Sequence, residues 1–337
     1  MEIMNALALL SNYLVVPALA YGSQLALGAL GVTLVYGILR FSNFAHGELM
    51  AFGTMAVILM TWFLQAQGIS FGALPTELLA LPVGILATVV LALGTDRVVY
   101  RFHRSKKSQP VIFLIASLAV MFFYSGLTRF IIGTADRNMG DDGARFIFTA
   151  REFKEWSGLD EGIALRTTQG ITVVVTLVCV VALFWFLNRT RAGKSMRAYS
   201  DNEDLALLSG VNPERVVLIA WILAAALATV AGTMYGLDKT FKPFIYLQLL
   251  LPIFASAIVG GLGSPVGAVA GGFVIAFSEI TVTFAYKRVL TYIMPGDNVP
   301  DGLVQLLSTE YKFAVSFVIL VVVLLVRPTG IFKGQSV

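Results

Sequence analysis

The sequence predicts an all-α integral membrane protein, a single bundle of about eight to ten transmembrane helices, some of them short or broken. Of the 337 residues, 57% are hydrophobic and only 13% are charged, whereas soluble domains carry roughly 25% charged residues. The mean hydropathy is +0.82. Apolar runs long enough to cross the ~30 Å hydrocarbon core of a bilayer recur along the whole chain. No long polar stretch divides them, so residues 1–337 are expected to form one transmembrane domain.

Ten apolar runs are the candidate spans. The first lacks a basic N-terminal region and carries Glu2, so we expect a retained membrane helix rather than a cleaved signal peptide. Only tight turns are expected between the first and second spans, and between the eighth and ninth. The candidate spans are residues 3–21, 23–40, 44–66, 78–96, 110–132, 169–188, 216–237, 245–262, 265–285 and 311–326.

The charges of the loops predict the orientation of the bundle. Residues 97–107 and 189–215 are rich in Arg and Lys, whereas residues 68–77 hold neither, and in the long insert at residues 133–168 the acidic residues outnumber the basic ones. By the positive-inside rule the first two loops are cytoplasmic and the other two extracytoplasmic. An even number of spans then places both termini in the cytoplasm. The basic residues 287–288 fall on the outer side in this scheme and are its exception.

A polar break separates the second and third runs. It contains Asn43, His46 and Glu48, and ionisable groups near membrane depth usually face the interior of a bundle. One interpretation is structural, with Ser42 or Asn43 capping the next helix and Glu48 favoured by its dipole. The other is that Asn43, His46 and Glu48 line a translocation pathway.

The residue inventory argues against several kinds of chemistry. The chain has two histidines and one cysteine, Cys179, and no H-E-x-x-H spacing, so no metal or cofactor site is predicted. It also lacks a G-x-S-x-G motif and a G-x-x-x-x-G-K-[ST] phosphate loop. We therefore expect a protein that is not an enzyme and binds no ATP of its own. If it pumps, a partner must supply the energy.

The basic loop at residues 189–215 carries a short amphipathic segment. Ser200 or Asp201 is the expected helix start, and Gly210 is the expected stop. Three acids in this segment disfavour an anionic lipid surface, so docking into a partner protein is the preferred interpretation.

A glycine-rich stretch spans residues 257–272. Gly260, Gly261, Gly263, Gly267 and Gly271 are expected to let helix backbones approach closely. Glu279 follows within the next span, where an acid needs a polar partner or water, and it is a second candidate for the pathway.

Four stretches together resemble the H-type permease subunits of the high-affinity branched-chain amino acid ABC importers. They read ALGVTLVYGILRFSNFAHGELMAFG (residues 29–53), GKSMRAYSDNEDLALLSGVNPERV (193–216), IVGGLGSPVGAVAGGFVIAFSE (258–279) and RPTGIF (327–332). The resemblance covers nearly the full chain, with the motifs in the expected order. The insert at 133–168 is longer than the family pattern, and residues 287–310 do not match it.

The resemblance implies an ABC importer permease fold in a bacterial or archaeal inner membrane. Such a permease pairs with a second homologous permease and with two cytoplasmic ATPases, which bind the ATP and Mg²⁺. An extracytoplasmic binding protein delivers the substrate, a branched-chain or other hydrophobic amino acid, and no nucleic acid is involved. The loop would be the ATPase-coupling element, with Arg197, Ala198, Ser200, Glu203, Ala206, Leu208, Gly210 and Val211 as its residues.

Two alternatives remain open at the level of sequence. Urea or short-chain amide permeases belong to the same family and share its motifs. An ion-coupled secondary transporter, with Glu48 or Glu279 as its proton site, is an alternative of another class. A membrane-embedded enzyme is disfavoured by the scarcity of histidine.

Overall fold

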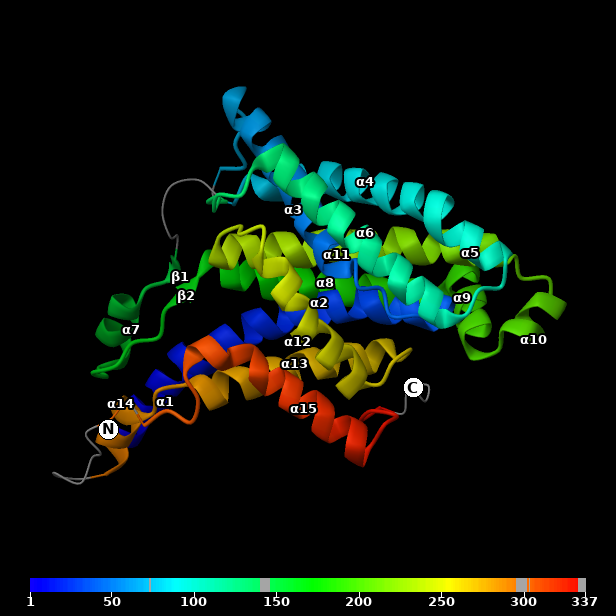
Figure 1. The fold of residues 1–337 in the computed structure, drawn as a ribbon. Helices are drawn as coiled ribbons and strands as arrows, with labels where there is room; N and C mark the ends of the chain where they lie inside the picture. The colour runs from blue at the N-terminus through cyan, green and yellow to red at the C-terminus, as the bar shows by residue number, and fades with distance from the viewer. Residues whose placement is uncertain (73, 140–145, 295–301, 303, 333–337) are drawn as a thin grey trace.

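Helices lying roughly along one axis make up the computed structural model, which describes residues 1–72, 74–139, 146–294, 302 and 304–332 (Figure 1). Within the described part, eight helical stretches are long and apolar enough to cross a membrane, and α12 is a shorter apolar helix. This confirms the predicted fold class. Apart from a short helix in the insert, the α-helices after the first are α3 (His46–Ala66), α4 (Glu77–Thr95), α5 (Arg101–Ser105), α6 (Pro110–Ile132), α8 (Thr167–Arg189), α9 (Arg191–Asp201), α10 (Glu203–Leu208), α11 (Pro213–Lys239), α12 (Ile245–Gly260), α13 (Pro265–Thr283), α14 (Lys287–Ile293) and α15 (Lys312–Val326).

The first two predicted spans form one continuous helix, Glu2–Leu39, of 38 residues. It comprises α1 (Glu2–Leu10), a π-helical turn (Ser11–Val15) and α2 (Val16–Leu39). At 1.5 Å per residue this helix is about 57 Å long, nearly twice the hydrocarbon core. The predicted turn near residue 22 is wrong, because Gly22 packs inside the bundle, where an added Cβ would meet the ring of Phe273 at 2.6 Å.

Helices α2 and α11 form the centre of the bundle. α2 packs against α13, α11, α8 and α12, and α11 also packs against α3 and α4. Both helices are buried on nearly all sides, as a helix apolar around its whole circumference should be. In contrast, α15 packs mainly on α12 and α13 and exposes Leu325 and Val326 at its far end.

The two ends of the bundle differ in composition. At one end, here called the basic end, lie α5, α9 and α10 with the Arg- and Lys-rich loops (Figure 1). At the other, the insert end, lie α1, α14 and the insert, which contains α7 (Ala150–Ser157) between the antiparallel strands β1 (Phe146–Phe148) and β2 (Leu165–Arg166). Residues 140–145 of the insert lie outside the described part.

The insert end is held together by contacts between three distant segments. Asn5 of α1 donates a hydrogen bond to Asp160 (2.9 Å), and Asn12 accepts one from the Ala164 N–H (2.9 Å). Arg288 of α14 pairs with Glu161 at 2.8 Å. The basic pair at 287–288, which contradicts the positive-inside rule, thus lies beside the acids of the insert.

The two termini lie at opposite ends of the bundle (Figure 1). The N-terminus sits at the insert end, whereas the chain after α15 returns to the basic end, where the Ile331 N–H bonds the Val259 carbonyl at 2.8 Å. The prediction that both termini share one side is therefore wrong. Its cause is the merging of the first two spans, which removes one crossing and leaves the placement of all later loops unchanged.

Candidate functional site

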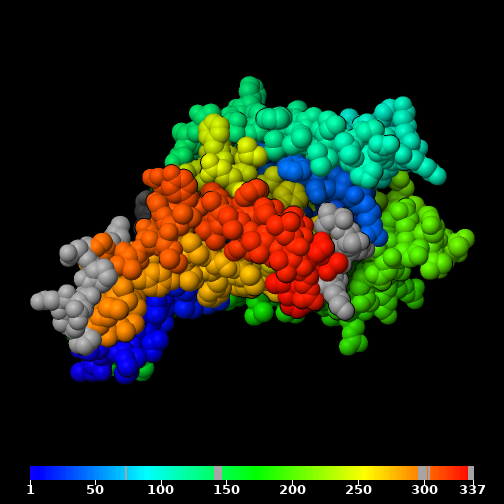
Figure 2. All heavy atoms as spheres, turned by 60° about the horizontal axis from the view of Figure 1, so that its bottom comes forward, coloured from blue at the N-terminus to red at the C-terminus, as the bar shows by residue number. Residues whose placement is uncertain are grey.

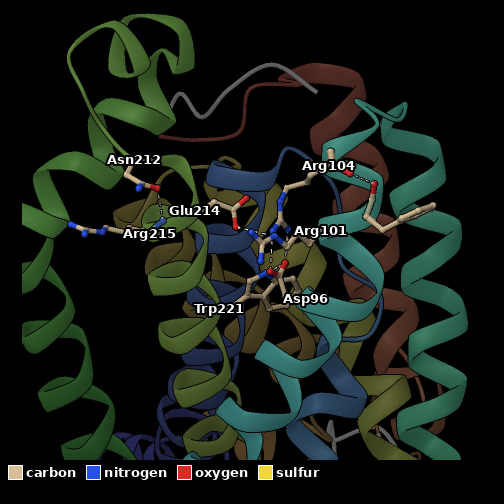
Figure 3. Close-up of polar contacts among 9 residues, drawn as sticks. Asp96, Arg101, Arg104, Asn212, Glu214, Arg215 and Trp221 are labelled. Carbon is tan, nitrogen blue, oxygen red and sulfur yellow. Dashed lines mark hydrogen bonds and ion pairs between the residues drawn. The ribbon is translucent and has the colours of Figure 1, made fainter.

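A carboxylate at the basic end joins α4 and α5 to α11 (Figure 3). Asp96 begins the π-helical turn Asp96–Tyr100 and accepts two hydrogen bonds from Arg104, at 2.5 and 2.9 Å. The indole Nε1 of Trp221 donates a third, at 2.7 Å. Beside this network, Arg101 forms a longer ion pair with Glu214 (3.5 Å) whose side chains are both about half exposed. Asp96 thus holds the basic loop on α11.

Aromatic rings extend this network to the break between α2 and α3. Tyr100 stacks on Trp221 (centroids 5.3 Å apart) and contacts Phe41 (5.2 Å), whose ring also stacks on Phe113. The Tyr100 hydroxyl lies 3.4 Å from Asn43 Oδ1. The polar break is therefore covered by protein, as nonhelical backbone at membrane depth must be.

The predicted amphipathic segment is two helices rather than one. α9 ends at Asp201, and Asn202 then starts α10 by accepting a hydrogen bond from the Leu205 N–H at 3.0 Å. The helix start predicted at Ser200 or Asp201 is wrong by one or two positions, because those residues complete α9. Tyr199 of α9 donates to Glu203 of α10 at 2.6 Å, which fixes the angle between the helices and, with burial as the larger cause, raises the Tyr199 pKa.

Gly210 ends α10 in a Schellman motif. The Gly210 N–H bonds the Leu207 carbonyl and the Val211 N–H bonds the Ala206 carbonyl, both at 3.0 Å. Gly210 has φ +80°, a conformation that favours glycine. Ala206 is buried, whereas Leu205 and Leu208 are 61% and 85% exposed. The pair α9–α10 thus presents leucine side chains away from the bundle at the basic end.

The inner face of α9 meets α2 and the α12–α13 turn. Arg40, in the left-handed conformation after α2, donates to the Ser200 carbonyl at 2.5 Å. Arg197 bonds Asn188 Oδ1 at 2.9 Å, and the exposed Ala198 accepts from the Asn202 N–H. A cavity of about 140 Å³ lies at this junction, lined by Gly37, Arg197, Ser200, Gly263 and neighbouring side chains. A movement of α9 would therefore be transmitted to α2 and α13.

Asn43, His46 and Glu48 lie inside the bundle rather than at its surface, with exposures of 3%, 0% and 1%. α3 begins at His46, whose ring packs against Gly31 of α2. The helix therefore starts beside the body of α2 rather than beyond its end at Leu39. Asn43 Oδ1 accepts from the Ala45 N–H at 3.1 Å, but no side chain caps the first turn of α3. Glu48 faces Ser125 and Arg129 of α6.

Glu279 of α13 has its partners on α15, about one turn from the insert end. Its carboxylate accepts a hydrogen bond from Ser316 and lies 3.6 Å from the ammonium of Lys312. That ammonium also sits over the Tyr21 ring, 3.5 Å from its centroid. Glu279 therefore anchors α15 to the bundle, and His46, Glu48 and Glu279 lie on different faces rather than in one cluster.

The glycines of the predicted packing stretch divide into two groups. A Cβ on Gly260, Gly267 or Gly271 would come within about 2.0–2.2 Å of a carbonyl oxygen of the facing helix, so these three permit the close approach of α12 and α13. Gly261 (φ +110°) and Gly263 (φ +83°) instead form the turn between the two helices.

A family model described as "Branched-chain amino acid transport system / permease component" matches residues 14–324. The chain belongs to this family.

Relatives within this permease family match over nearly the whole chain. The high-affinity branched-chain amino acid transport system permease protein LivH of Escherichia coli (strain K12) is 31% identical over 323 residues, which cover 94% of this chain and 93% of that protein. LivH of Salmonella typhimurium is 30% identical with the same coverage. The permease protein BraD of Pseudomonas aeruginosa is 28% identical and covers 96% of this chain and 95% of its own length. The chain is therefore a permease-type membrane protein over nearly all of the matched length.

Several structural residues of this permease were missed at the level of sequence. Asp96 and Trp221 lie 125 residues apart, and no spacing rule joins them. A lone acid at the end of an apolar run was the available signal, since such an acid requires partners. The partners of Glu279, Lys312 and Ser316, lie near the start of the last span. A lysine at that position looks like an ordinary interfacial residue, so the sequence does not mark it as the partner of a buried acid.

Proposed function

We propose that this chain is the transmembrane permease subunit of an ABC importer that moves branched-chain or other hydrophobic amino acids into the cytoplasm. The single observation that carries the proposal is the match to LivH and BraD over more than nine-tenths of each chain. In this proposal a second permease, two cytoplasmic ATPases that bind ATP and Mg²⁺, and an extracytoplasmic binding protein complete the transporter in the inner membrane.

The geometry of α9–α10 supports a docking role for the basic end. Its leucines are exposed although its inner face is fixed to the bundle, and the carbonyl of Ser200 is bonded to the end of α2. An ATPase bound there could shift α9, and with it α2 and α13, between two arrangements that favour different states of the permease pair. The basic end is then cytoplasmic, and the N-terminus and the insert are extracytoplasmic.

Affinity purification and leucine uptake test the proposal. Tagged protein from native membranes should carry two P-loop ATPases and a second permease, and cells lacking this chain should lose high-affinity uptake of leucine, isoleucine or valine. Uptake of urea or a short amide in its place would favour the alternative permease of the same family. Purification without any ATPase would refute the importer assignment.

A glycine substitution separates coupling from folding. Gly210→Ala strains the end of α10 by about 1 kcal/mol without a steric clash, since no atom lies within 4 Å of an added Cβ. Gly68→Ala, at φ +72° and equally open, is the matched control at the insert end. We expect Gly210→Ala alone to lower substrate-stimulated ATP hydrolysis severalfold. Equal activity of both variants would argue against α9–α10 as the coupling element and for an ion-coupled mechanism.

A further inference from the structure

One face of α12, a short apolar helix of the bundle, is exposed and chemically mixed. Phe244, Gln248 and Leu251 follow one another at helical spacing, and Phe244 and Leu251 are 54% and 36% exposed. The amide of Gln248 is exposed in the same stripe. Lipid hydrocarbon cannot satisfy an exposed amide, so such a residue is expected to face a partner or a water-filled space.

Helix α6 lies beside this stripe of α12. Both pack on α3, and neither packs appreciably on the other among the described residues. Figure 2 shows parts of α12 and of the segment around the start of α3 at the surface between α6 and α15. Phe254 continues the stripe toward the basic end, where its ring lies 5.3 Å from that of Phe44. The Phe44 N–H in turn bonds Ser117 of α6 at 3.2 Å.

The positively charged side chain of Arg129 lies against Phe244, at the end of the stripe nearest the insert end. The guanidinium of Arg129, in the last turn of α6, lies 3.9 Å from the centroid of the Phe244 ring. Its Nε is buried without a hydrogen-bond partner, as are the Thr128 hydroxyl and Glu48 Oε1 nearby. An arginine held over an aromatic ring presents its remaining donors in a planar fork that matches a carboxylate.

The backbone leading into α12 is strained. Thr240, a β-branched residue, has φ +86°, which costs of order 1–3 kcal/mol and persists mainly where function requires it. At Thr240 the chain leaves α11 and changes direction, so that α12 begins after Phe244, next to Arg129. The β-bridge between Arg137 and Phe241 holds this turn in place.

We propose that the exposed face of α12 beside α6, from Arg129 and Phe244 through Gln248 to Phe44 and Phe254, lines the route of the transported amino acid. Arg129 receives the α-carboxylate at the outer end, Gln248 accompanies the polar backbone of the amino acid, and the phenyl rings contact its aliphatic side chain. This assignment rests on the proposed function, and it leaves the coupling role of α9–α10 untouched.

Cysteine labelling in the assembled importer tests the route. The chain has one native cysteine, so Gln248→Cys is made in a Cys179→Ala background, with Leu177→Cys on the exposed apolar face of α8 as the matched control. We expect a charged, membrane-impermeant thiosulfonate to modify Gln248→Cys about tenfold faster, because only a thiol in contact with water ionises. The labelling of Gln248→Cys should slow when substrate-loaded binding protein and ATP are both present at saturating concentrations. Equally slow labelling of both positions would overturn the route.

Uptake kinetics test the role of Arg129. Arg129→Gln should raise the KM for leucine about tenfold, because one charge-assisted hydrogen bond to the substrate is lost. Arg129→Lys should restore part of the affinity. Phe130→Leu, next in sequence and 89% exposed, should behave as wild type. Unchanged KM in Arg129→Gln would overturn the carboxylate assignment. A wild-type chain that imports no amino acid refutes the proposed function instead, and the labelling contrast still decides whether this face of α12 lines a route.

Discussion

At the scale of single residues, buried charges in this permease are stabilised by local pairing. Asp96 lies at the basic end with a side-chain exposure of 13%, and Arg104 satisfies both of its oxygens. Glu279 is paired with Lys312 near the other end. A charge taken out of water without such a partner would be far more costly than the pair itself.

Arginine substitutions at the basic end should separate a buried from an exposed ion pair. Arg104→Met leaves Asp96 without its cation and should destabilise the protein by about 2–3 kcal/mol. Arg101→Met removes only the half-exposed pair with Glu214 and should cost under about 1 kcal/mol. Thermal unfolding in detergent, followed by tryptophan fluorescence, measures the difference. Equal shifts in Tm would contradict the view that Asp96 holds α5 on α11.

The insert should show a pH dependence of its own. Thr149 and Glu152 form a capping box at the start of α7, and the hydrogen bonds from Thr149 lower the Glu152 pKa. A lowered folded-state pKa contributes stability above the ordinary value near 4.5 and loses it as the pH falls through the folded-state pKa. The protection of residues 150–157 against hydrogen exchange, taken relative to the intrinsic exchange rate at each pH, should fall below pH ~4.5. Glu152→Gln should abolish the dependence, and its persistence in that variant would assign it elsewhere.

Sequence reasoning was informative about residue type and weak about partners. The polar break was visible in the sequence because Asn43, His46 and Glu48 interrupt apolar runs, but only the fold shows that Tyr100 covers it. Similarly, Gly210 was recognised as a stop, whereas the Schellman bonds to Ala206 and Leu207 require coordinates. Contacts between distant helices leave no local pattern.

At the scale of secondary-structure elements, glycine content decides how closely α12 and α13 approach. Gly22 was mistaken for a turn because glycine serves both turns and close packing, and sequence does not distinguish the two. The same ambiguity explains why Gly261 and Gly263 belong to a turn while Gly260, Gly267 and Gly271 belong to a helix contact.

A glycine-to-alanine pair tests the helix contact. In Gly271→Ala the new Cβ would meet the Ser256 carbonyl at 2.0 Å, so α12 and α13 must separate at a cost of about 1–3 kcal/mol. Gly94→Ala on α4 meets no atom within 4 Å and should stabilise the helix by about 0.4–1 kcal/mol. Opposite signs in the change of Tm are expected. A neutral Gly271→Ala would mean that the two helices are not in rigid contact.

At the scale of the whole molecule, the number of crossings decides on which sides of the membrane the two chain ends lie. Counting Glu2–Leu39 once and α12 as a crossing gives termini on opposite sides, and the loops keep the sides that their charges predict. The basic pair at 287–288 fits once the acidic insert is seen beside it. The side of each loop stays a prediction from its charges, whereas the continuity of the first helix could not be predicted from them.

Accessibility in intact cells tests this topology. In a Cys179→Ala background, Ile3→Cys is 72% exposed at the insert end, and Lys194→Cys is exposed at the basic end. If the insert end is extracytoplasmic, an impermeant maleimide should label Ile3→Cys in spheroplasts and reach Lys194→Cys only after permeabilisation. Glu2–Leu39 is one helix about 57 Å long, so Ile3 and Leu39 cannot lie on the same side of the membrane while that helix stays continuous. Labelling of both cysteines only after permeabilisation would mean that the long helix breaks in the membrane and that the ten-span arrangement holds there.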